Sequence, residues 1–331
     1  MTARTMPLEL TLADVDRAAA LVAGVVPVTP TFRWPLLCAR LGVDVMLKHE
    51  NHTPLGAFKV RGGLAYVAAL RERAPHVTHL VSATRGNHGQ SIAFAAARAG
   101  IPAEIYVPLG NSPDQNSAMA TFGAKVVEIG KDFDEAKHAA QRAAKERELH
   151  FVPSFHRDLV LGVASYALEF FRAAPNLDTV YVGVGMGSGI CGLIETRDLL
   201  GLKTEIVGVS AINAPATSKS FAAGAPVTTA SALTFADGIA TREPSAEAIE
   251  VICRGAARFI EVSEDAIAEA MRIYFDDTHQ VVEGAGAAPL AALLQERGRM
   301  EGRNVGVVLS GGNIERARFL TVLGGGTPAV R

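Results

Sequence analysis

Two kinds of apolar pattern alternate along most of the chain. Short runs of mostly apolar residues are typical of buried parallel strands, and longer stretches with an apolar residue at every third or fourth position are typical of helices. We expect strands at residues 43–48, 78–83, 103–107, 125–129, 179–184, 204–209, 259–262 and 304–309. We expect helices at residues 14–22, 34–41, 59–73, 88–99, 113–122, 133–148, 159–172, 190–200, 264–275 and 285–297. Strand, helix and strand at this spacing predict parallel sheets joined by right-handed crossovers.

The length of the chain predicts more than one folding unit. The chain has 331 residues, whereas an average domain has about 150. The alternating pattern continues on both sides of residue 151 and shows no sequence repeat, so two α/β sheets in one chain is the simplest interpretation. Only the stretch 211–242 is interpreted as mostly loop.

The composition excludes several classes of partner. Charged residues make up 20% of the chain and the formal net charge is −2, so nothing favours a nucleic acid or an anionic membrane as the main partner. Cys38, Cys191 and Cys253 lie far apart in apolar sequence, as buried reduced thiols do, and no zinc-ligand spacing occurs among them. The N-terminus has no targeting pattern and no long uncharged apolar run follows, so we expect a soluble, cytoplasmic protein.

A glycine-rich segment follows the expected strand 179–184. Glycines at positions 183, 185, 187, 189 and 192 let several backbone N–H groups and the N-terminus of the next helix converge on one anion, which predicts a phosphate cradle. The subset Gly187-Ser-Gly189-Ile-Cys-Gly192 also matches the dinucleotide fingerprint, so a dinucleotide-binding oxidoreductase is an alternative. The next strand ends at Ser210 rather than at the acid that binds ribose, which disfavours that alternative. A purely structural glycine turn is another alternative.

Three further segments place reactive or polar side chains at the ends of expected elements. Lys59 lies where a loop with Pro54 and Gly56 meets a helix, although a solvated lysine on a first helical turn fits the same local sequence. The turn Arg85–Gln90 follows a strand, and it suits either the binding of a carboxylate or a plain helix start. Ser310 follows the last strand, at the sheet edge where α/β proteins bind ligands, or serves as a helix cap.

These four features, in this order, resemble the fold-type II pyridoxal-phosphate enzymes, in particular their threonine/serine dehydratase and serine racemase branch. The segment Lys48-His-Glu50-Asn51…Gly56-Ala-Phe58-Lys59-Val-Arg61-Gly62 looks like that family's Schiff-base motif, and Glu283-Gly-Ala-Gly-Ala-Ala also matches the family. The resemblance covers residues 28–319. It implies a fold like that of the tryptophan synthase β-subunit, with two open, twisted, mostly parallel sheets flanked by helices. It also implies a large cofactor-binding domain of residues 1–52 and 153–331, and a small inserted domain of residues 53–152.

The resemblance implies roles at the matching positions. Lys59 would bind pyridoxal 5'-phosphate covalently and act as the base at the substrate α-carbon, with Phe58 beside the ring. Asn87 would bind the ring hydroxyl, Ser310 would face the ring nitrogen, and Glu283 would lie near the cofactor. The residues that would hold the phosphate are Gly185, Met186, Gly187, Ser188 and Gly189. The residues that would bind the substrate carboxylate are Thr84, Arg85, Gly86, Asn87 and His88.

The activity implied by the resemblance is that of an ammonia-lyase. Such a dehydratase converts a β-hydroxy amino acid of the threonine or serine type into a 2-oxo acid and ammonia by α,β-elimination. A serine racemase or a β-replacement enzyme on the same fold is the nearest alternative. The resemblance also implies a homodimer, and the short segment after Ser310 predicts the catabolic form without a regulatory domain.

Two positions depart from the family pattern. Arg85 stands where serine racemase has a serine on the opposite face of the substrate, and a guanidinium is a poor acid–base partner, so racemisation is disfavoured. The same guanidinium can bind a second anionic group, which makes a 3-hydroxyaspartate ammonia-lyase an alternative; an arginine tied to a structural acid is the other interpretation. Ser210 stands where other members have a carboxylate for a divalent cation, so we expect no metal site.

Overall fold

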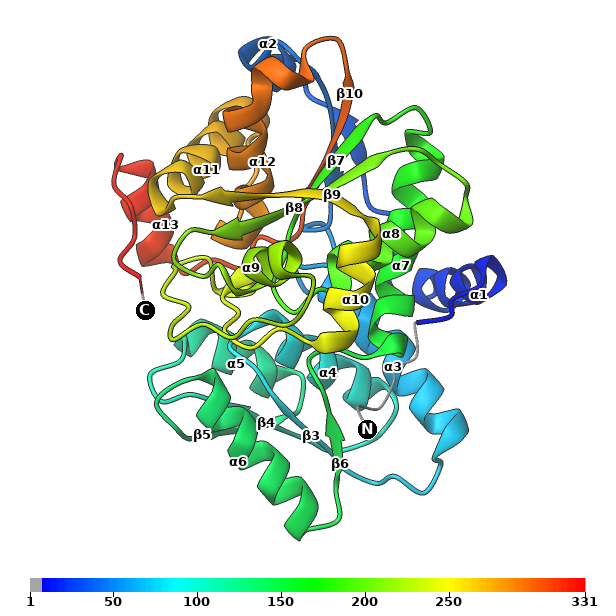
Figure 1. Cartoon of the computed structure of the whole chain (residues 1–331). Coiled ribbons are helices and arrows are strands. Elements are labelled where there is room, and N and C mark those ends of the chain that lie inside the picture. The colour runs from blue at the N-terminus through cyan, green and yellow to red at the C-terminus, as the bar shows by residue number, and fades with distance from the viewer. Residues whose placement is uncertain (1–7, 331) are drawn as a thin grey trace.

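The computed structural model describes residues 8–330 (Figure 1). The N-terminal segment 1–7, where the sequence predicts no targeting signal, and residue 331 lie outside the described residues. Within residues 8–330, no helix is both long enough and apolar enough to span a membrane.

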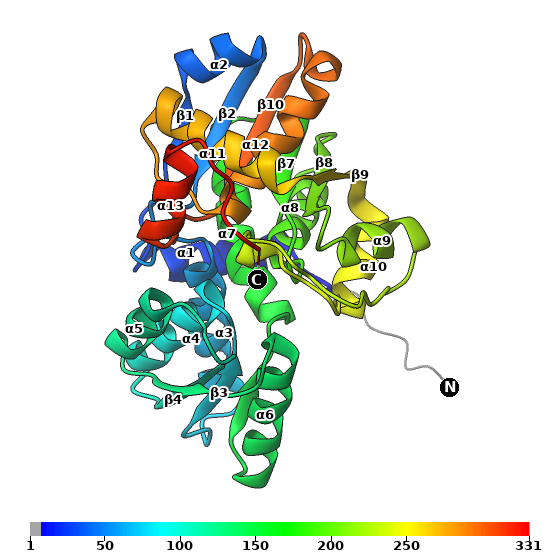
Figure 2. The same ribbon diagram turned by 90° about the vertical axis from the view of Figure 1, so that its left-hand side faces the viewer.

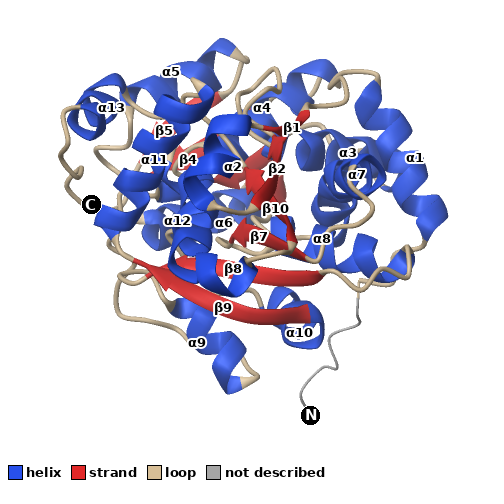
Figure 3. Cartoon of the chain, turned by 90° about the horizontal axis from the view of Figure 1, so that it is seen from above, coloured by secondary structure: helices blue, strands red, loops and turns tan. Residues whose placement is uncertain are grey.

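The larger of two sheets has six strands in the order β1-β2-β10-β7-β8-β9. Its strands are β1 (Thr31–Arg33), β2 (Asp44–His49), β7 (Thr179–Gly183), β8 (Glu205–Ala211), β9 (Ala256–Val262) and β10 (Asn304–Leu309). β1 runs antiparallel to β2, and the other neighbouring strands are parallel. The central strands β7 and β10 are almost wholly buried because helices cover both faces of the sheet (Figure 3).

The smaller sheet has four strands in the order β5-β4-β3-β6, all parallel. Its strands are β3 (Leu80–Ala83), β4 (Ala103–Val107), β5 (Lys125–Glu128) and β6 (His150–Val152). Figure 2 shows this sheet and its helices below the six-stranded sheet. The two mostly parallel sheets confirm the predicted fold class, whereas the domain boundaries at residues 52 and 153 stay a prediction.

The α-helices of the described residues connect these strands. They are α1 (Leu12–Ala23), α2 (Pro35–Leu41), α3 (Lys59–Arg73), α4 (Asn87–Arg98), α5 (Pro113–Thr121), α6 (Phe133–Glu146), α7 (Arg157–Ala173), α8 (Ser188–Leu199), α9 (Ala216–Ala223), α10 (Ala246–Gly255), α11 (Glu264–Thr278), α12 (Gly284–Glu296) and α13 (Arg316–Leu323). Two 3₁₀ helices are η1 (Asp237–Ile239) and η2 (Arg297–Met300).

The structure differs from the expected elements where the apolar pattern is short or interrupted. β1 and β6 have three residues each, which is too few to display a strand period. Helix α9 lies within the stretch interpreted as loop. Its polar residues Thr217, Ser218 and Ser220 are buried, and the Ser220 Oγ donates to the Ala216 carbonyl at 2.7 Å. Buried hydroxyl groups of this kind hydrogen-bond to the backbone. Because they occupy buried positions, the helix does not show apolar residues at helical spacing.

Candidate active site

One pocket is lined by the loops that follow β3, β7 and β10 and by the start of α3. Parallel strands bring their carboxyl ends to the same edge of a sheet, so segments far apart in sequence meet there. Every site residue predicted from the sequence lines this pocket, namely Phe58, Lys59, Thr84, Arg85, Gly86, Asn87, His88, Gly185, Met186, Gly187, Ser188, Gly189, Glu283 and Ser310. Their roles stay predictions.

Lys59 is the first residue of α3, and the loop before it is held firmly. The Thr53 hydroxyl bonds both the N–H (3.0 Å) and the carbonyl (2.9 Å) of Ala57, and the Phe58 N–H donates to the Ser310 carbonyl at 3.0 Å. The Lys59 Nζ donates to the Ser188 Oγ at 3.0 Å and lies 5.0 Å from the centre of the Phe58 ring. Burial of this amine lowers its pKa to about 8, so an appreciable fraction is unprotonated near neutral pH.

The glycine segment between β7 and α8, where the sequence predicts an anion cradle, lies on the pocket wall. Gly187, the N-cap of α8, has φ of 101°, which favours glycine. No side chain of the described residues caps this helix, so its first N–H groups are available to a ligand. A methyl group on Gly189 would meet no atom closer than 3.6 Å, from Phe58 and Tyr166. Packing within the described residues therefore does not require glycine at position 189.

The turn between β3 and α4 is organised by Thr84. Its Oγ1 accepts from the N–H groups of Gly86 at 2.9 Å and Gly89 at 3.2 Å, so this hydroxyl shapes the turn. His88 is buried near Ser82, whose Oγ lies 3.2 Å from the His88 Nε2. Burial, with a smaller contribution from the nearby Lys59 charge, lowers the pKa of His88 to about 3. His88 is therefore neutral at physiological pH, so it adds no positive charge to the turn.

Asn87 is held from two sides in the pocket. Its Nδ2 donates to both Glu283 oxygens, at 2.9 and 3.1 Å, and its Oδ1 accepts from the Asn313 Nδ2 at 2.8 Å. Burial raises the pKa of Glu283 to about 7, although the bond from Asn87 opposes this. Asn313 was not predicted as a site residue, although it belongs to the Ser310-Gly-Gly-Asn313 turn at the ligand-binding edge of the sheet.

The elevated pKa of Glu283 predicts a pH effect on stability. Between pH 4.5 and 7 the folded chain keeps a proton on Glu283 that the unfolded chain has released, so the free energy of unfolding falls as the pH rises through this window. From about pH 5 to about pH 7.5, we expect the free energy of unfolding of the wild type to fall by about 2 kcal/mol relative to that of Glu283→Gln. This loss is smaller than the whole pKa shift would give, because water reaches the pocket. Urea unfolding of both chains without added ligand measures this, and parallel pH curves would contradict it.

Arg85 forms an ion pair with Asp237, which also lines the pocket. Its Nη2 lies 3.6 Å from the Asp237 Oδ1, and the Arg318 Nη1 lies 3.2 Å from the Asp237 Oδ2. Asp237 of η1 thus lies between two guanidinium groups. Sequence reasoning missed Asp237 and Arg318, which carry no local motif. Among the described residues, no group of three metal-ligating side chains gathers at Ser210 or elsewhere.

The chain is similar in sequence and in structure to several known proteins. The sequence model of a family described as "Pyridoxal-phosphate dependent enzyme" matches residues 22–311. The L-threonine ammonia-lyase of Geobacter sulfurreducens is 35% identical over 278 residues, which are 83% of this chain and 69% of that protein. The catabolic L-threonine dehydratase of Staphylococcus aureus is 31% identical over 332 residues, 98% of this chain and 96% of that protein. The crystal structure of a pyridoxal 5'-phosphate-dependent aspartate racemase superposes with a TM-score of 0.87 at 27% identity, covering 94% of this chain and 98% of that one.

Proposed function

The chain belongs to the pyridoxal-phosphate dependent enzyme family, and from that premise we propose that it is an ammonia-lyase. Its substrate is a β-hydroxy amino acid of the threonine or serine type, and its products are a 2-oxo acid and ammonia. The observation that carries this proposal is the desolvated Lys59 amine, which lies 3.0 Å from Ser188 at the mouth of the glycine cradle. Relatives named threonine ammonia-lyase and threonine dehydratase support the reaction. The homodimer and the cytoplasmic location are parts of the same proposal.

The residues of the pocket fit pyridoxal 5'-phosphate. The uncapped first turn of α8 suits its phosphate, and the ring of Phe58 and the amide of Asn87 line the same pocket. Lys59 is the amine to which the cofactor would be joined. When bound, the cofactor supplies an electron-withdrawing ring that makes the substrate α-hydrogen acidic.

The chain's own side chains supply proton transfer and orientation. Because its pKa is about 8, the Lys59 amine can take the α-proton in its neutral form. The N–H groups at the start of α4, in the turn after Thr84, can orient the substrate carboxylate. The β-hydroxyl leaves as water with the proton that Lys59 has removed from the α-carbon, and a second water replaces the amine, which departs as ammonia. The amino acid and one water are therefore converted into the 2-oxo acid, ammonia and one water, and all atoms are accounted for.

Racemisation would need a side chain on the opposite face of the substrate that can return a proton. Arg85 is the residue that departs from the racemase pattern, and a guanidinium stays protonated and cannot act as a base. We therefore propose elimination rather than racemisation as the main reaction.

A panel of amino acids tests the proposed function. Full-length protein loaded with pyridoxal 5'-phosphate should release 2-oxo acid and ammonia in equal amounts from L-threonine or L-serine. Loaded protein that releases neither product from any β-hydroxy amino acid would refute the proposal. Formation of D-serine at a rate rivalling elimination would refute the assignment of Arg85.

The environment of Arg85 favours 3-hydroxyaspartate as a second candidate substrate. Arg85 and Arg318 both line the pocket and pair with the Asp237 carboxylate, and Arg318 also pairs with Glu315 at 3.7 Å, so guanidinium groups that a distal substrate carboxylate can bind are present in the pocket. A similar structure, at 27% identity, is that of an aspartate racemase, whose named substrate carries such a group.

Replacing Arg85 by alanine separates the two candidates. If the distal carboxylate binds there, kcat/KM for 3-hydroxyaspartate should fall about 30-fold more than kcat/KM for threonine, as loss of a charge-assisted hydrogen bond predicts. Arg242→Ala is the matched control, because Arg242 also lines the pocket but is paired with Asp134 at 2.7 Å. An unchanged ratio of the two substrates in Arg85→Ala would eliminate the second candidate.

A further inference from the structure

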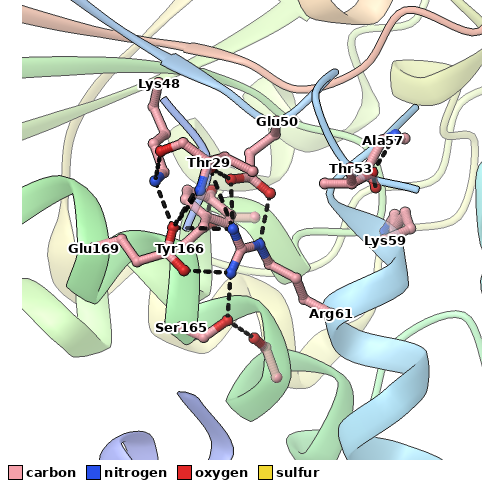
Figure 4. Close-up of polar contacts among 12 residues, drawn as sticks. Thr29, Lys48, Glu50, Thr53, Ala57, Lys59, Arg61, Ser165, Tyr166 and Glu169 are labelled. Carbon is pink, nitrogen blue, oxygen red and sulfur yellow. Dashed lines mark hydrogen bonds and ion pairs between the residues drawn. The ribbon is translucent and has the colours of Figure 1, made fainter. Parts of the chain in front are cut away.

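A buried cluster of four charged side chains adjoins the helix that carries Lys59 (Figure 4). The cluster, called here the Arg61 cluster, consists of Lys48, Glu50, Arg61 and Glu169. The side chains of Lys48, Glu50 and Arg61 are 0% exposed and that of Glu169 is 15% exposed. Lys48, Glu50 and Arg61 belong to the segment that resembles the family's lysine motif, yet none of them lines the pocket.

Arg61 uses its whole guanidinium to join two carboxylates. Its Nε and Nη2 donate to the Glu50 oxygens at 2.7 and 3.0 Å, and its Nη1 and Nη2 donate to the Glu169 oxygens at 2.7 and 3.0 Å. Ser165 and Thr29 accept further bonds from it at 3.1 and 3.2 Å. Double bidentate pairing fixes both the position and the plane of the guanidinium. The cluster therefore ties the first turn of α3 to the end of β2 and to α7.

Charge balance makes this cluster tolerable in the interior. The Lys48 ammonium donates to Glu169 at 2.5 Å and to the Thr29 carbonyl at 2.9 Å, so two cations face two carboxylates. Burial lowers the pKa of Lys48 and opposes the ionisation of Glu169, but Arg61 and Lys48 outweigh burial and hold the pKa of Glu169 low. Because desolvation offsets most of the Coulombic gain, apolar residues could stabilise the fold equally well. What apolar residues could not supply is a fixed orientation.

The Arg61 cluster holds the first turn of α3 in addition to the bonds made by the preceding loop. The N-cap of α3, Phe58, makes no side-chain cap bond. Residues two positions apart in a helix point to roughly opposite sides, so the hold on Arg61 contributes to setting the side of α3 from which Lys59 projects. Figure 4 shows Arg61 reaching into the cluster while Lys59 points away from it. A methyl group on Gly162 of α7 would lie 2.2 Å from the Arg61 carbonyl, so the two helices touch at the cluster without room to shift.

We propose that Arg61, Glu50, Glu169 and Lys48 are positioning residues that aim the Lys59 amine into the pocket and so govern how tightly the cofactor is held. The Arg61 cluster touches neither the cofactor site nor the substrate and acts through α3. This inference rests on the proposed function in taking Lys59 as the attachment point.

A pair of matched variants tests the proposal. Glu169→Gln removes one of the two carboxylates that hold Arg61. Glu296→Gln is the control, because Glu296 is 14% exposed, pairs with Arg258 in a similar network at 2.7 Å, and lies outside the pocket lining. Full-length protein is loaded with pyridoxal 5'-phosphate, and its dissociation constant is obtained from the visible absorption band. We expect cofactor binding about 10-fold weaker in Glu169→Gln than in Glu296→Gln at comparable losses of stability, as for other supporting-shell substitutions.

A second readout separates positioning from general loosening. The pH dependence of reductive methylation of Lys59 in the cofactor-free full chain gives the pKa of its amine, expected to be about 8 in the wild type. In Glu169→Gln the amine should gain water and its pKa should rise toward 10.5, whereas the loss of a carboxylate alone would lower it. An unchanged or lowered pKa, or cofactor binding equal to that of the control, would overturn the proposal.

A charge-neutral variant keeps the test decisive if Glu169→Gln does not fold. Lys48→Met with Glu169→Gln removes one charge of each sign and leaves Arg61 paired with Glu50 alone. We expect this variant to fold and to bind the cofactor about 3-fold more weakly than wild type, because half of the Arg61 hold remains. Wild-type affinity in this variant would refute the proposal. A wild type that never develops the visible band would instead refute the proposed function.

Discussion

Replacing Lys59 by alanine is expected to reduce turnover of the best β-hydroxy amino acid by at least about 10⁴-fold, because one amine serves as both attachment point and base. Within residues 8–330 that amine donates a hydrogen bond to the Ser188 Oγ at 3.0 Å, and burial lowers its pKa to about 8. Because burial disfavours the Lys59 ammonium in the folded chain, the variant should be at least as stable to urea as the wild type near neutral pH. Steady-state release of 2-oxo acid measures the first effect and urea unfolding the second.

The matched control is Lys219→Ala, on the exposed surface of α9. It should retain full turnover. Residual activity in Lys59→Ala within 100-fold of the wild type would show that another residue takes the α-proton, and the assignment of Lys59 as the base would be wrong.

Replacing Gly189 by alanine is expected to weaken binding of pyridoxal 5'-phosphate by about 100-fold without affecting the fold. The added methyl group would meet no protein atom closer than 3.6 Å, so the cofactor-free chain should accept it. Gly189 lies in the first turn of α8 and lines the pocket, so we expect the added methyl to obstruct the close approach of the phosphate to the backbone N–H groups there. Loss of two or three such charge-assisted bonds corresponds to about 3 kcal/mol.

The control for this prediction is Gly298→Ala in η2, where an added methyl meets nothing within 4 Å. Both variants should unfold at the same urea concentration as the wild type when no cofactor is present. Cofactor binding by Gly189→Ala that equals binding by Gly298→Ala would place the phosphate elsewhere.

Much of the fold could be predicted because its central strands are buried on both faces. β4 (Ala103–Val107) and β10 (Asn304–Leu309) have the predicted bounds, since a continuous apolar run is what a central parallel strand requires. Helix α3 begins at the predicted residue because Pro54 and Gly56 break the chain before it. Helix α9 could not be predicted, because its buried hydroxyl groups look like solvent-exposed positions.

The environment of the predicted site residues could not be derived from local sequence. The sequence around Lys59 fits a solvated lysine equally well, and only the surrounding walls lower its pKa. Arg85, Asp237 and Arg318 meet through contacts between distant segments. In the sequence Glu169 is indistinguishable from an ordinary polar residue of an amphipathic helix, yet it pairs with Arg61 in the buried Arg61 cluster. Such contacts follow from the packing of the elements and not from their periodicity.

Mapping the attachment point of pyridoxal 5'-phosphate tests the central claim most directly. The full-length protein is mixed with the cofactor, treated with borohydride to fix any link to an amine, digested and analysed by mass spectrometry. The account predicts that the cofactor is attached to the peptide containing Lys59 and to no other lysine. Attachment to a different lysine, or none in folded protein, would contradict it.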